Sequence, residues 1–295
     1  KNINPQIVHA FMIHAALVGG IIARLLNIPI IIWNIFSTDL SLKTNKFGTV
    51  LIIKICALIS KIIPDKIIFD SHSAYFSHKS AGYFFQKMRI INNGIDTGIF
   101  SPDYKRYDHY KRNNFRKEDF IIGLIARYHP VKGHDIFIKA IKVVNEKYKN
   151  VKILFNGSNV DTSNEELMYM INKEGVNNLI HISDSRLKIT DILFSCDILV
   201  SSSKAESFPN IICEAMSSEI PCVVTDVGDC SRIVGDTGLI VNPNDSVALA
   251  NAIGEFIEMP LNERIELGKQ ARKRVCENFS LQLMIGEYHN LYSSL

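Results

Sequence analysis

The amino-acid sequence predicts an α/β protein in which helices cover two parallel β-sheets. Short apolar runs alternate with helix-like patterns along the 295 residues, which is typical of βαβ units. A charged interval without hydrophobic periodicity, residues 101–118, interrupts this series and indicates a linker between two domains. The chain is 47% hydrophobic and 21% charged, so it can bury a core in each domain.

Residues 1–100 are predicted to form a partial Rossmann-like domain. Its apolar runs predict strands at residues 6–10, 29–33, 66–69 and 89–92, and its helical patterns lie at 15–26, 47–62 and 71–81. A complete Rossmann-like half has six strands, so we expect this N-terminal domain to be truncated, with its opening strands outside the sequence. A C-terminal helix, residues 281–295, is expected to complete the domain.

Residues 119–280 are predicted to form the second Rossmann-like domain. Six apolar runs predict its strands at residues 120–126, 151–156, 179–182, 198–202, 222–225 and 238–241. Helical patterns fit between them, and a break at 278–280 ends the helix predicted at 261–277. Open α/β sheets bind their ligands at the carboxyl ends of the strands, so we expect functional residues in the loops that follow these strands.

Composition and motifs exclude several classes of protein. The net charge of +3, from 33 basic and 30 acidic residues, indicates no nucleic-acid partner. Neither H-E-x-x-H nor D-x-D occurs, so we expect no metal ion. The six cysteines form no C-x-x-C pair, and charges interrupt the most apolar stretches, which argues against a membrane span. We therefore expect a cytoplasmic protein.

The strongest motif is the segment SSSKAESFPNIICEAM, which contains Glu206 and, seven intervening residues later, Glu214. A helix is predicted to begin near Pro209, because proline is favoured in a first helical turn. The N–H groups at that helix start suit a diphosphate. Glu214 lies about 7 Å further along the helix, where it could accept hydrogen bonds from ribose hydroxyls, while Glu206 could hold sugar hydroxyls. The alternative, two solvated glutamates, is less compatible with the carboxyl edge of a parallel sheet.

A second motif, IIGLIARYHPVKGHDIF, contains two cations. Arg127 comes at the end of a predicted strand, and Lys132 directly precedes Gly133 and a helical pattern. Cations at this edge suit a pyrophosphate, and in the absence of a metal they would offset the charge that develops on a departing diphosphate. The alternative is a solvated loop with incidental basic residues.

These segments, together with RIINNGIDTGIFSPD and DVGDCSRIVGDTG, resemble retaining glycosyltransferase family 4, the glycosyl transferases group 1. The resemblance runs in order from about His9 to Tyr292. It implies the GT-B fold, with two Rossmann-like domains facing a cleft. It also implies a retaining, metal-independent hexosyltransferase that uses a nucleotide sugar, with UDP as the default nucleotide, as substrate rather than cofactor. The acceptor would be a glycan or a lipid-linked glycan of surface polysaccharide biosynthesis.

The resemblance also implies roles for individual residues. Arg127 and Lys132 would contact the donor diphosphate, Glu206 the sugar and Glu214 the ribose. The remaining donor-binding positions are the backbone around Pro209, namely Phe208, Asn210 and Ile211, and the base-pocket turns at Gly157 and Arg186. In the family, the departing phosphate itself helps to deprotonate the acceptor, so no protein nucleophile is nominated.

The N-terminal segment VHAFMIH is similar to the family's V-H-x-x-x-x-H pattern. The similarity implies that His14 lies near the transferred sugar or the acceptor; the alternative is a polar residue at a helix start. The sequence departs from the family pattern at two places. Residues 35–38 stand where relatives often have Arg-His, so the acceptor contacts of that pair are not carried over. Arg232 stands where many relatives have Glu, in the loop after the DVGD turn.

The helix predicted at 47–62 has two interpretations. Its apolar residues and the lysines Lys43, Lys46, Lys54 and Lys61 suit an anionic membrane surface, which would make the protein peripheral to the inner face of a membrane. The favoured interpretation is a core helix whose lysines reach outward to solvent.

Two alternatives to sugar transfer stay open at the level of sequence. One is a nucleotide-sugar epimerase of the same fold, which labelled donor would distinguish by its product. The other is a non-catalytic or truncated remnant that only binds nucleotide.

Overall fold

The computed structural model describes residues 3–38, 40, 46–102, 115–183 and 187–295. The chain divides into two compact units. Unit 1 comprises residues 1–94, 205–208 and 282–295, and unit 2 comprises residues 95–204 and 209–281. The predicted linker, 101–118, belongs to unit 2, but its residues 103–114 lie outside the described residues.

Unit 1 contains a parallel four-stranded sheet in the order β1-β2-β3-β4. The strands are β1 (Ile7–Phe11), β2 (Ile30–Ile35), β3 (Lys66–Phe69) and β4 (Met88–Ile90). Isoleucine dominates β2 and β3, and the side chains of Ile31, Trp33 and Phe69 are fully buried. Continuous apolar runs of this kind are required because a parallel sheet is covered on both faces.

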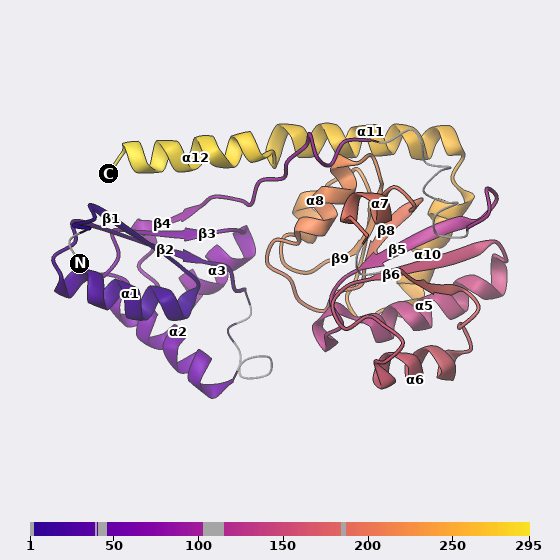
Figure 1. Cartoon of the computed structure of the whole chain (residues 1–295), viewed down its shortest axis with the longest axis horizontal. Coiled ribbons are helices and arrows are strands. Elements are labelled where there is room, and N and C mark those ends of the chain that lie inside the picture. The colour runs from indigo at the N-terminus through magenta and orange to yellow at the C-terminus, as the bar shows by residue number, and fades with distance from the viewer. Residues whose placement is uncertain (1–2, 39, 41–45, 103–114, 184–186) are drawn as a thin grey trace. The chain divides into compact units, whose positions relative to one another are not determined.

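Helices cover both faces of this sheet (Figure 1). On one face lie α1 (Ile13–Leu25) and α2 (Phe47–Ile59), which pack beside each other. On the other face, α12 (Leu281–Ser293) buries Leu291 against Ile32, Ile68 and Ile91. The short helices α3 (His72–Ser80) and η1 (Phe85–Lys87) connect β3 to β4. The C-terminal helix therefore packs in unit 1, although the residues of unit 2 lie between it and β4 in the sequence.

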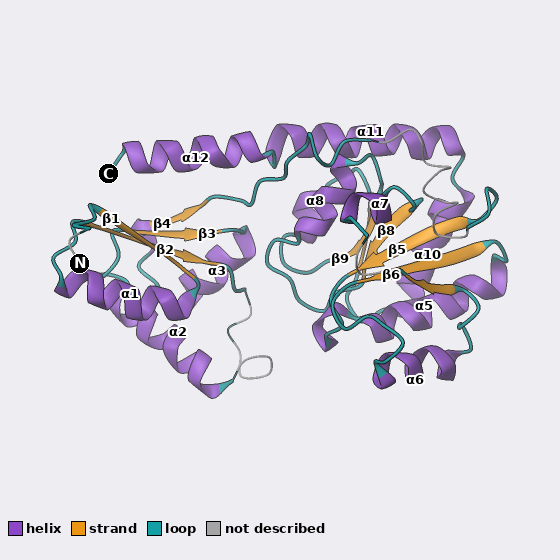
Figure 2. Ribbon diagram, in the orientation of Figure 1, coloured by secondary structure: helices purple, strands orange, loops and turns teal. Residues whose placement is uncertain are grey.

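Unit 2 contains a parallel six-stranded sheet in the order β10-β9-β8-β5-β6-β7. Its strands are β5 (Phe120–Ile125), β6 (Val151–Asn156), β7 (Ile180–Ile182), β8 (Ile198–Ser201), β9 (Cys222–Thr225) and β10 (Leu239–Val241). Helices lie on both sides of these strands (Figure 2). The core of unit 2 includes Phe137, Phe155 and Phe256, all fully buried.

Capping residues mark the starts of two helices of unit 2. They are α5 (His134–Lys147), α6 (Glu165–Glu174), α7 (Ile189–Leu193), α8 (Asn210–Ser217), α9 (Cys230–Val234), α10 (Ser246–Glu258) and α11 (Leu261–Asn278), with a 3-10 turn η2 (Pro130–Lys132). The Asn164 side chain accepts a hydrogen bond from Leu167 N at the start of α6, and Gly175 ends that helix with φ 71°. Asp245 caps α10 in the same way.

The predicted elements all occur, with small shifts at their ends. The predicted helix 47–62 ends at Ile59, and the predicted strand 89–92 runs from Met88 to Ile90. Pro209 is the N-cap of α8 rather than its first residue. Among the described helices, none is both long enough and apolar enough to span a bilayer.

Candidate functional site

The carboxyl edge of the unit 2 sheet brings most of the predicted donor-site residues together. Strands β5 and β8 are neighbours at the centre of the sheet, and from them the chain continues to β6 on one side and to β9 on the other. Loops that leave adjacent strands in opposite directions open a crevice at this switch point, where α/β folds bind ligands. The loops after β5, β6 and β8 carry the predicted cations, Gly157 and the helix α8.

Arg127 and Gly157 lie against each other at this edge. Ala126 N donates to Asn156 O at 2.9 Å, and Tyr128 N donates to Ser158 O at 2.8 Å, so the β5 and β6 loops run side by side. A Cβ on Gly157 would lie 2.1 Å from Ala126 O. Only glycine therefore permits this approach, which holds the backbone that carries the exposed Arg127 side chain.

Lys132 ends the η2 turn next to a strictly constrained glycine. Gly133 has φ 67°, and a Cβ there would lie 2.0 Å from Ser202 O. The Ser202 hydroxyl is within 3.0 Å of the carbonyl oxygens of both Lys132 and Gly133, to which it donates. The loop after β8 thereby holds the backbone of Lys132, whose side chain is half-buried.

Further contacts join the loop after β8 to β9, to the η2 turn and to α5. The Thr225 hydroxyl donates to Ser203 O at 2.6 Å, Lys204 N donates to Val131 O at 2.7 Å, and the Lys204 ammonium pairs with Asp135 at 2.9 Å. Sequence reasoning missed Ser202, Ser203 and Thr225 as site residues. The polar run that follows an apolar strand could have pointed to them, because hydroxyl groups that are buried there must find hydrogen-bond partners.

The helix α8 begins at the same edge. Asn210 and Ile211 are its first residues, so their N–H groups lie at the positive end of the helix dipole. Glu214, one turn further on, is half-buried, and burial raises the pKa of its carboxyl above the ordinary value. A carboxylate whose charge is poorly hydrated gains from hydrogen-bond donors, and ribose hydroxyls supply them.

Glu206 and Phe208 belong to the loop 205–208, which packs in unit 1. Its Ser207 hydroxyl donates to Asp70 Oδ1 at 2.7 Å and lies 2.7 Å from the Ser71 hydroxyl. Glu206 is half-buried, and Phe208 is buried. The structure thus groups these two residues apart from the other donor-site residues, which lie in unit 2.

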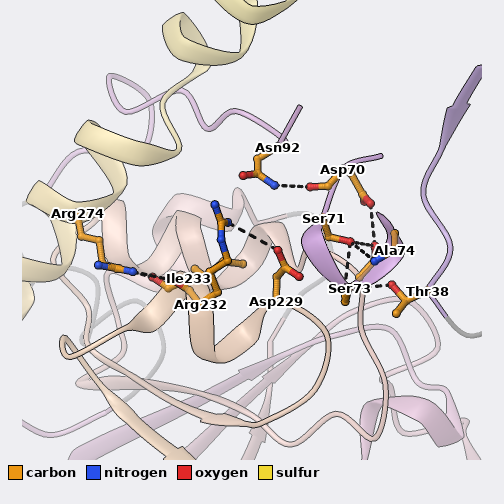
Figure 3. A network of polar contacts seen from close by, with 11 residues as sticks. Thr38, Asp70, Ser71, Ser73, Ala74, Asn92, Asp229, Arg232, Ile233 and Arg274 are labelled. Atoms are coloured by element: carbon orange, nitrogen blue, oxygen red, sulfur yellow. Dashed lines mark hydrogen bonds and ion pairs between the residues drawn. The ribbon is translucent and has the colours of Figure 1, made fainter. Parts of the chain in front are cut away.

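Ser71 and Asp70, at the carboxyl end of β3, form a polar network within unit 1 (Figure 3). Ser71 caps α3 by accepting from Ala74 N at 3.0 Å and from the Ser73 hydroxyl at 3.1 Å. Asn92 Nδ2 donates to Asp70 O at 2.7 Å. Sequence reasoning did not identify Asp70, although a carboxylate directly after a buried strand was visible in the segment KIIFD.

The two histidines of the VHAFMIH segment occupy different environments in unit 1. His14 is exposed on the first turn of α1. His9 lies in β1, where its Nδ1 is 2.7 Å from the Tyr292 hydroxyl and its ring stacks on Phe11. Burial lowers the pKa of His9 to about 4, so this imidazole is neutral at pH 7. His14, not His9, is therefore positioned to meet a solvent-borne molecule.

Arg232 is held within unit 2 by its own helix and by an aromatic ring. Its guanidinium lies 3.7 Å from Asp229 Oδ2 and 5.6 Å from the centre of the Phe279 ring. Arg274 donates to the carbonyl oxygens of Arg232 and Ile233 at 2.8 Å (Figure 3). Arg232 is thus held by contacts with α9 and with Phe279. Arg186 lies outside the described residues.

The unit 2 edge has the chemistry of a nucleoside-diphosphate site. Arg127 and Lys132 provide positive charge, α8 provides N–H groups, and Glu214 provides an acceptor for hydroxyls. Within the described part of the chain, no three His, Cys, Asp or Glu side chains come together so that they could hold a metal ion.

Comparisons with known proteins identify the family of the chain. Residues 106–274 match the family model described as Glycosyl transferases group 1. The chain belongs to this family and is a glycosyltransferase. It is 29% identical over 303 residues to the capsular polysaccharide biosynthesis glycosyltransferase CapM of Staphylococcus aureus, covering 98% of this chain and 77% of CapM.

A second relative and two solved structures extend the comparison. The UDP-Gal:alpha-D-GlcNAc-diphosphoundecaprenol alpha-1,3-galactosyltransferase of Escherichia coli is 22% identical, with 97% of this chain and 75% of the relative covered. HepE of Anabaena, solved with UDP and glucose, superposes with a TM-score of 0.87 at 20% identity, over 98% of this chain and 78% of HepE. Sucrose-phosphate synthase of Thermosynechococcus elongatus also superposes with a TM-score of 0.87, at 19% identity, over 99% of this chain and 74% of the synthase. The fold is GT-B.

Proposed function

We propose that the protein transfers a hexose from a UDP-sugar to a hydroxyl group of a glycan or lipid-linked acceptor, with retention of anomeric configuration and without a metal ion. The observation that supports this most directly is the cationic edge of unit 2. Arg127 and Lys132 are carried by loops that Gly157 and Ser202 hold in place, next to the start of α8 and Glu214.

The names of relatives support the donor and the acceptor. CapM is named for capsular polysaccharide biosynthesis, and the Escherichia coli relative is named for transfer from UDP-galactose to a diphosphoundecaprenol-linked sugar. HepE was solved with UDP-glucose. We therefore assign this protein a UDP-sugar donor and a role in surface polysaccharide biosynthesis. Its six free cysteines suit the reducing cytoplasm, where we place it.

The proposed reaction exchanges one bond at the anomeric carbon for another on the same face. The bond from this carbon to the diphosphate oxygen breaks as the acceptor oxygen forms its bond, and the acceptor proton passes to the departing diphosphate, so UDP is the leaving group. Arg127, Lys132 and the N–H groups of α8 stabilise the negative charge that grows on this diphosphate. Glu214 binds the ribose, and Glu206 and His14 act on the sugar and acceptor.

A donor screen tests the proposal. UDP-, GDP- and ADP-sugars are compared by thermal shift, since a ligand at 100 times its Kd adds about 2.7 kcal/mol to the stability of the protein. UDP-sugars should raise the melting temperature most. Transfer of radiolabelled sugar to an acceptor should then continue in EDTA, with the product retaining the donor's configuration. Activity that EDTA abolishes and magnesium or manganese restores would contradict the metal-free mechanism.

A further inference from the structure

A small cavity lies within unit 2, where the loop after β5 meets the helices α5 and α6, which pack beside each other (Figure 1). Tyr128 and Pro130 line it from that loop, and Met170 lines it from α6. Arg127 directly precedes Tyr128, so the cavity and the candidate donor site share a loop. Its volume is about 190 Å³. Sites for drug-sized ligands measure roughly 300–1,000 Å³, so the cavity suits a single ring rather than a nucleotide.

His134, on the first turn of α5, is the most deeply buried side chain of this cavity that can form hydrogen bonds. It is 2% exposed, and among the described residues neither of its ring nitrogens has a hydrogen-bond partner. Its ring centre lies 5.3 Å from that of Tyr128 and 5.8 Å from that of Phe155. Burial lowers the pKa of His134 to about 4, so the ring is neutral at pH 7. A neutral imidazole has one donor and one acceptor nitrogen, and leaving both without partners is costly.

The charged side chains of the cavity, in contrast, have partners. The Lys204 ammonium lies 2.9 Å from Asp135 Oδ1 and 3.0 Å from Asp135 Oδ2. Burial, and then a hydrogen bond to Glu166, raise the pKa of the Tyr128 hydroxyl to about 12, so this hydroxyl is protonated and donates to the carboxylate. Two carboxylates and one ammonium give the cavity a net charge of −1 when its histidines are neutral. This charge disfavours an anion such as a phosphate group.

We propose that this cavity is a binding subsite for one neutral sugar ring. A sugar hydroxyl serves either nitrogen of His134, because it both donates and accepts. The Glu166 carboxylate accepts from a further hydroxyl. Tyr128, Pro130 and Met170 provide an apolar wall for the C–H groups of the ring, and small-molecule sites commonly combine such walls with a few polar groups.

Two sources can supply the ring, the sugar of the donor and a sugar unit of the acceptor. The loop that lines the cavity also carries Lys132, so a ring bound here lies next to the candidate donor site. The chemistry that the cavity recognises is the same in both cases. The inference concerns the binding of a sugar and does not require the transfer reaction proposed above.

NMR of the ring nitrogens of labelled histidine tests the subsite, because a new hydrogen bond shifts the signals of a neutral imidazole. The probes are the methyl α-glycosides of glucose, galactose, mannose and N-acetylglucosamine. We expect at least one of them to move the His134 signals saturably. His78 is the internal control, since it is equally buried, its pKa is also lowered to about 4 and it lies in unit 1. The variant His134→Phe identifies the His134 signals by removing them.

The variant Glu166→Ala should weaken glycoside binding about tenfold, roughly the value of one hydrogen bond to a charged group. Its matched control is Glu165→Ala, which removes the neighbouring carboxylate on the first turn of α6, outside the cavity, and should bind like the wild type. Both side chains are exposed, so both variants should fold. The proposal is overturned if no glycoside moves the His134 signals, if the two variants bind alike, or if choline moves these signals as strongly as the sugars, because the cavity would then be a cation site.

The same titration in saturating UDP-glucose distinguishes the two sources. A glycoside that UDP-glucose excludes marks the cavity as the subsite of the donor sugar, and a glycoside that still binds marks it as an acceptor subsite. Both results support a sugar subsite. A failure of the proposed function is separate, since it would appear as absent transfer activity while the glycoside still moved the His134 signals.

Discussion

At the scale of single residues, the site depends on charge that is held in place before the reaction begins. Lys132 illustrates this: its backbone oxygen accepts from Ser202, and the following residue is a glycine for which no other amino acid can substitute without collision. A cation held in this way needs no rearrangement when charge grows on a leaving group, so its effect is largest in the transition state.

Lys132→Ala should therefore lower kcat much more than it raises KM for the donor. Loss of one preorganised partner of a developing anion typically costs about 100- to 1000-fold in kcat, or about 2.7 to 4 kcal/mol. Steady-state kinetics of Lys132→Ala and of the exposed Lys139→Ala, a control on α5, measure this. A rise in KM alone would mean that Lys132 binds ground state and transition state equally.

Glu214 and Glu206 should differ in what they bind, because we propose that Glu214 holds the ribose and Glu206 the transferred sugar. Calorimetric titration with free UDP should show weaker binding to Glu214→Ala and nearly unchanged binding to Glu206→Ala, while both variants lose transfer activity. Equal losses of UDP affinity would remove the distinction.

At the scale of elements, contacts between distant segments hold the helices of unit 2 in place. Ile95 forms an isolated parallel β-bridge with Ser280. Arg272 on α11 donates hydrogen bonds to Phe100 O at 2.9 Å and to Thr97 O at 3.1 Å. Ser217 at the end of α8 donates to the same Phe100 oxygen at 2.5 Å. The segment 95–100 consequently belongs to unit 2, whereas the predicted boundary placed it in the first domain.

Arg272→Ala should destabilise unit 2 by about 2 to 3 kcal/mol, because hydrogen bonds from a charged donor are worth more than neutral ones and the carbonyl groups would lose a partner. Urea unfolding should show the loss as a lower transition midpoint. The neighbouring Lys273→Ala is the control, since this lysine is 75% exposed in its side chain. An unchanged midpoint in Arg272→Ala would show that the segment 95–100 is held by other contacts.

At the scale of the whole molecule, buried histidines in both units link stability to pH. Burial lowers the pKa of His78 in unit 1 and of His134 in unit 2 to about 4, whereas histidine in an unfolded chain titrates near 6.5. Above pH 6.5 these histidines are neutral in both the folded and the unfolded protein. Between pH 6.5 and 4 the unfolded chain takes up protons that the folded protein does not, so stability falls as the pH is lowered.

Each of these histidines should cost up to about 3 kcal/mol of stability at pH 4 relative to pH 7. In urea unfolding from pH 7 to pH 4.5, His78→Phe should flatten the pH dependence, and the exposed His289→Phe should leave it unchanged. His78 is suited to this test because its ring is buried within unit 1, in α3, whereas Arg127 and Lys132 belong to unit 2. A wild-type slope in His78→Phe would show that this imidazole is protonated in the folded state.

The sequence by itself determined the two parallel sheets and most of the residues at the carboxyl edge of unit 2. Buried parallel strands require continuous apolar runs, so the runs at 66–69, 151–156 and 222–225 predicted β3, β6 and β9 with the bounds observed. The motifs then predicted Arg127, Lys132 and Glu214 as donor-site residues, because the loops and helix starts that follow parallel strands gather at one edge of a sheet.

Only the tertiary structure decided how that edge and the loop 205–208 are held. Ser202 is 70 positions from the Lys132 oxygen to which it donates, and Ser207 is 137 positions from Asp70. Periodicity describes one segment at a time, whereas these features arise from packing between segments that the chain brings together only when it folds.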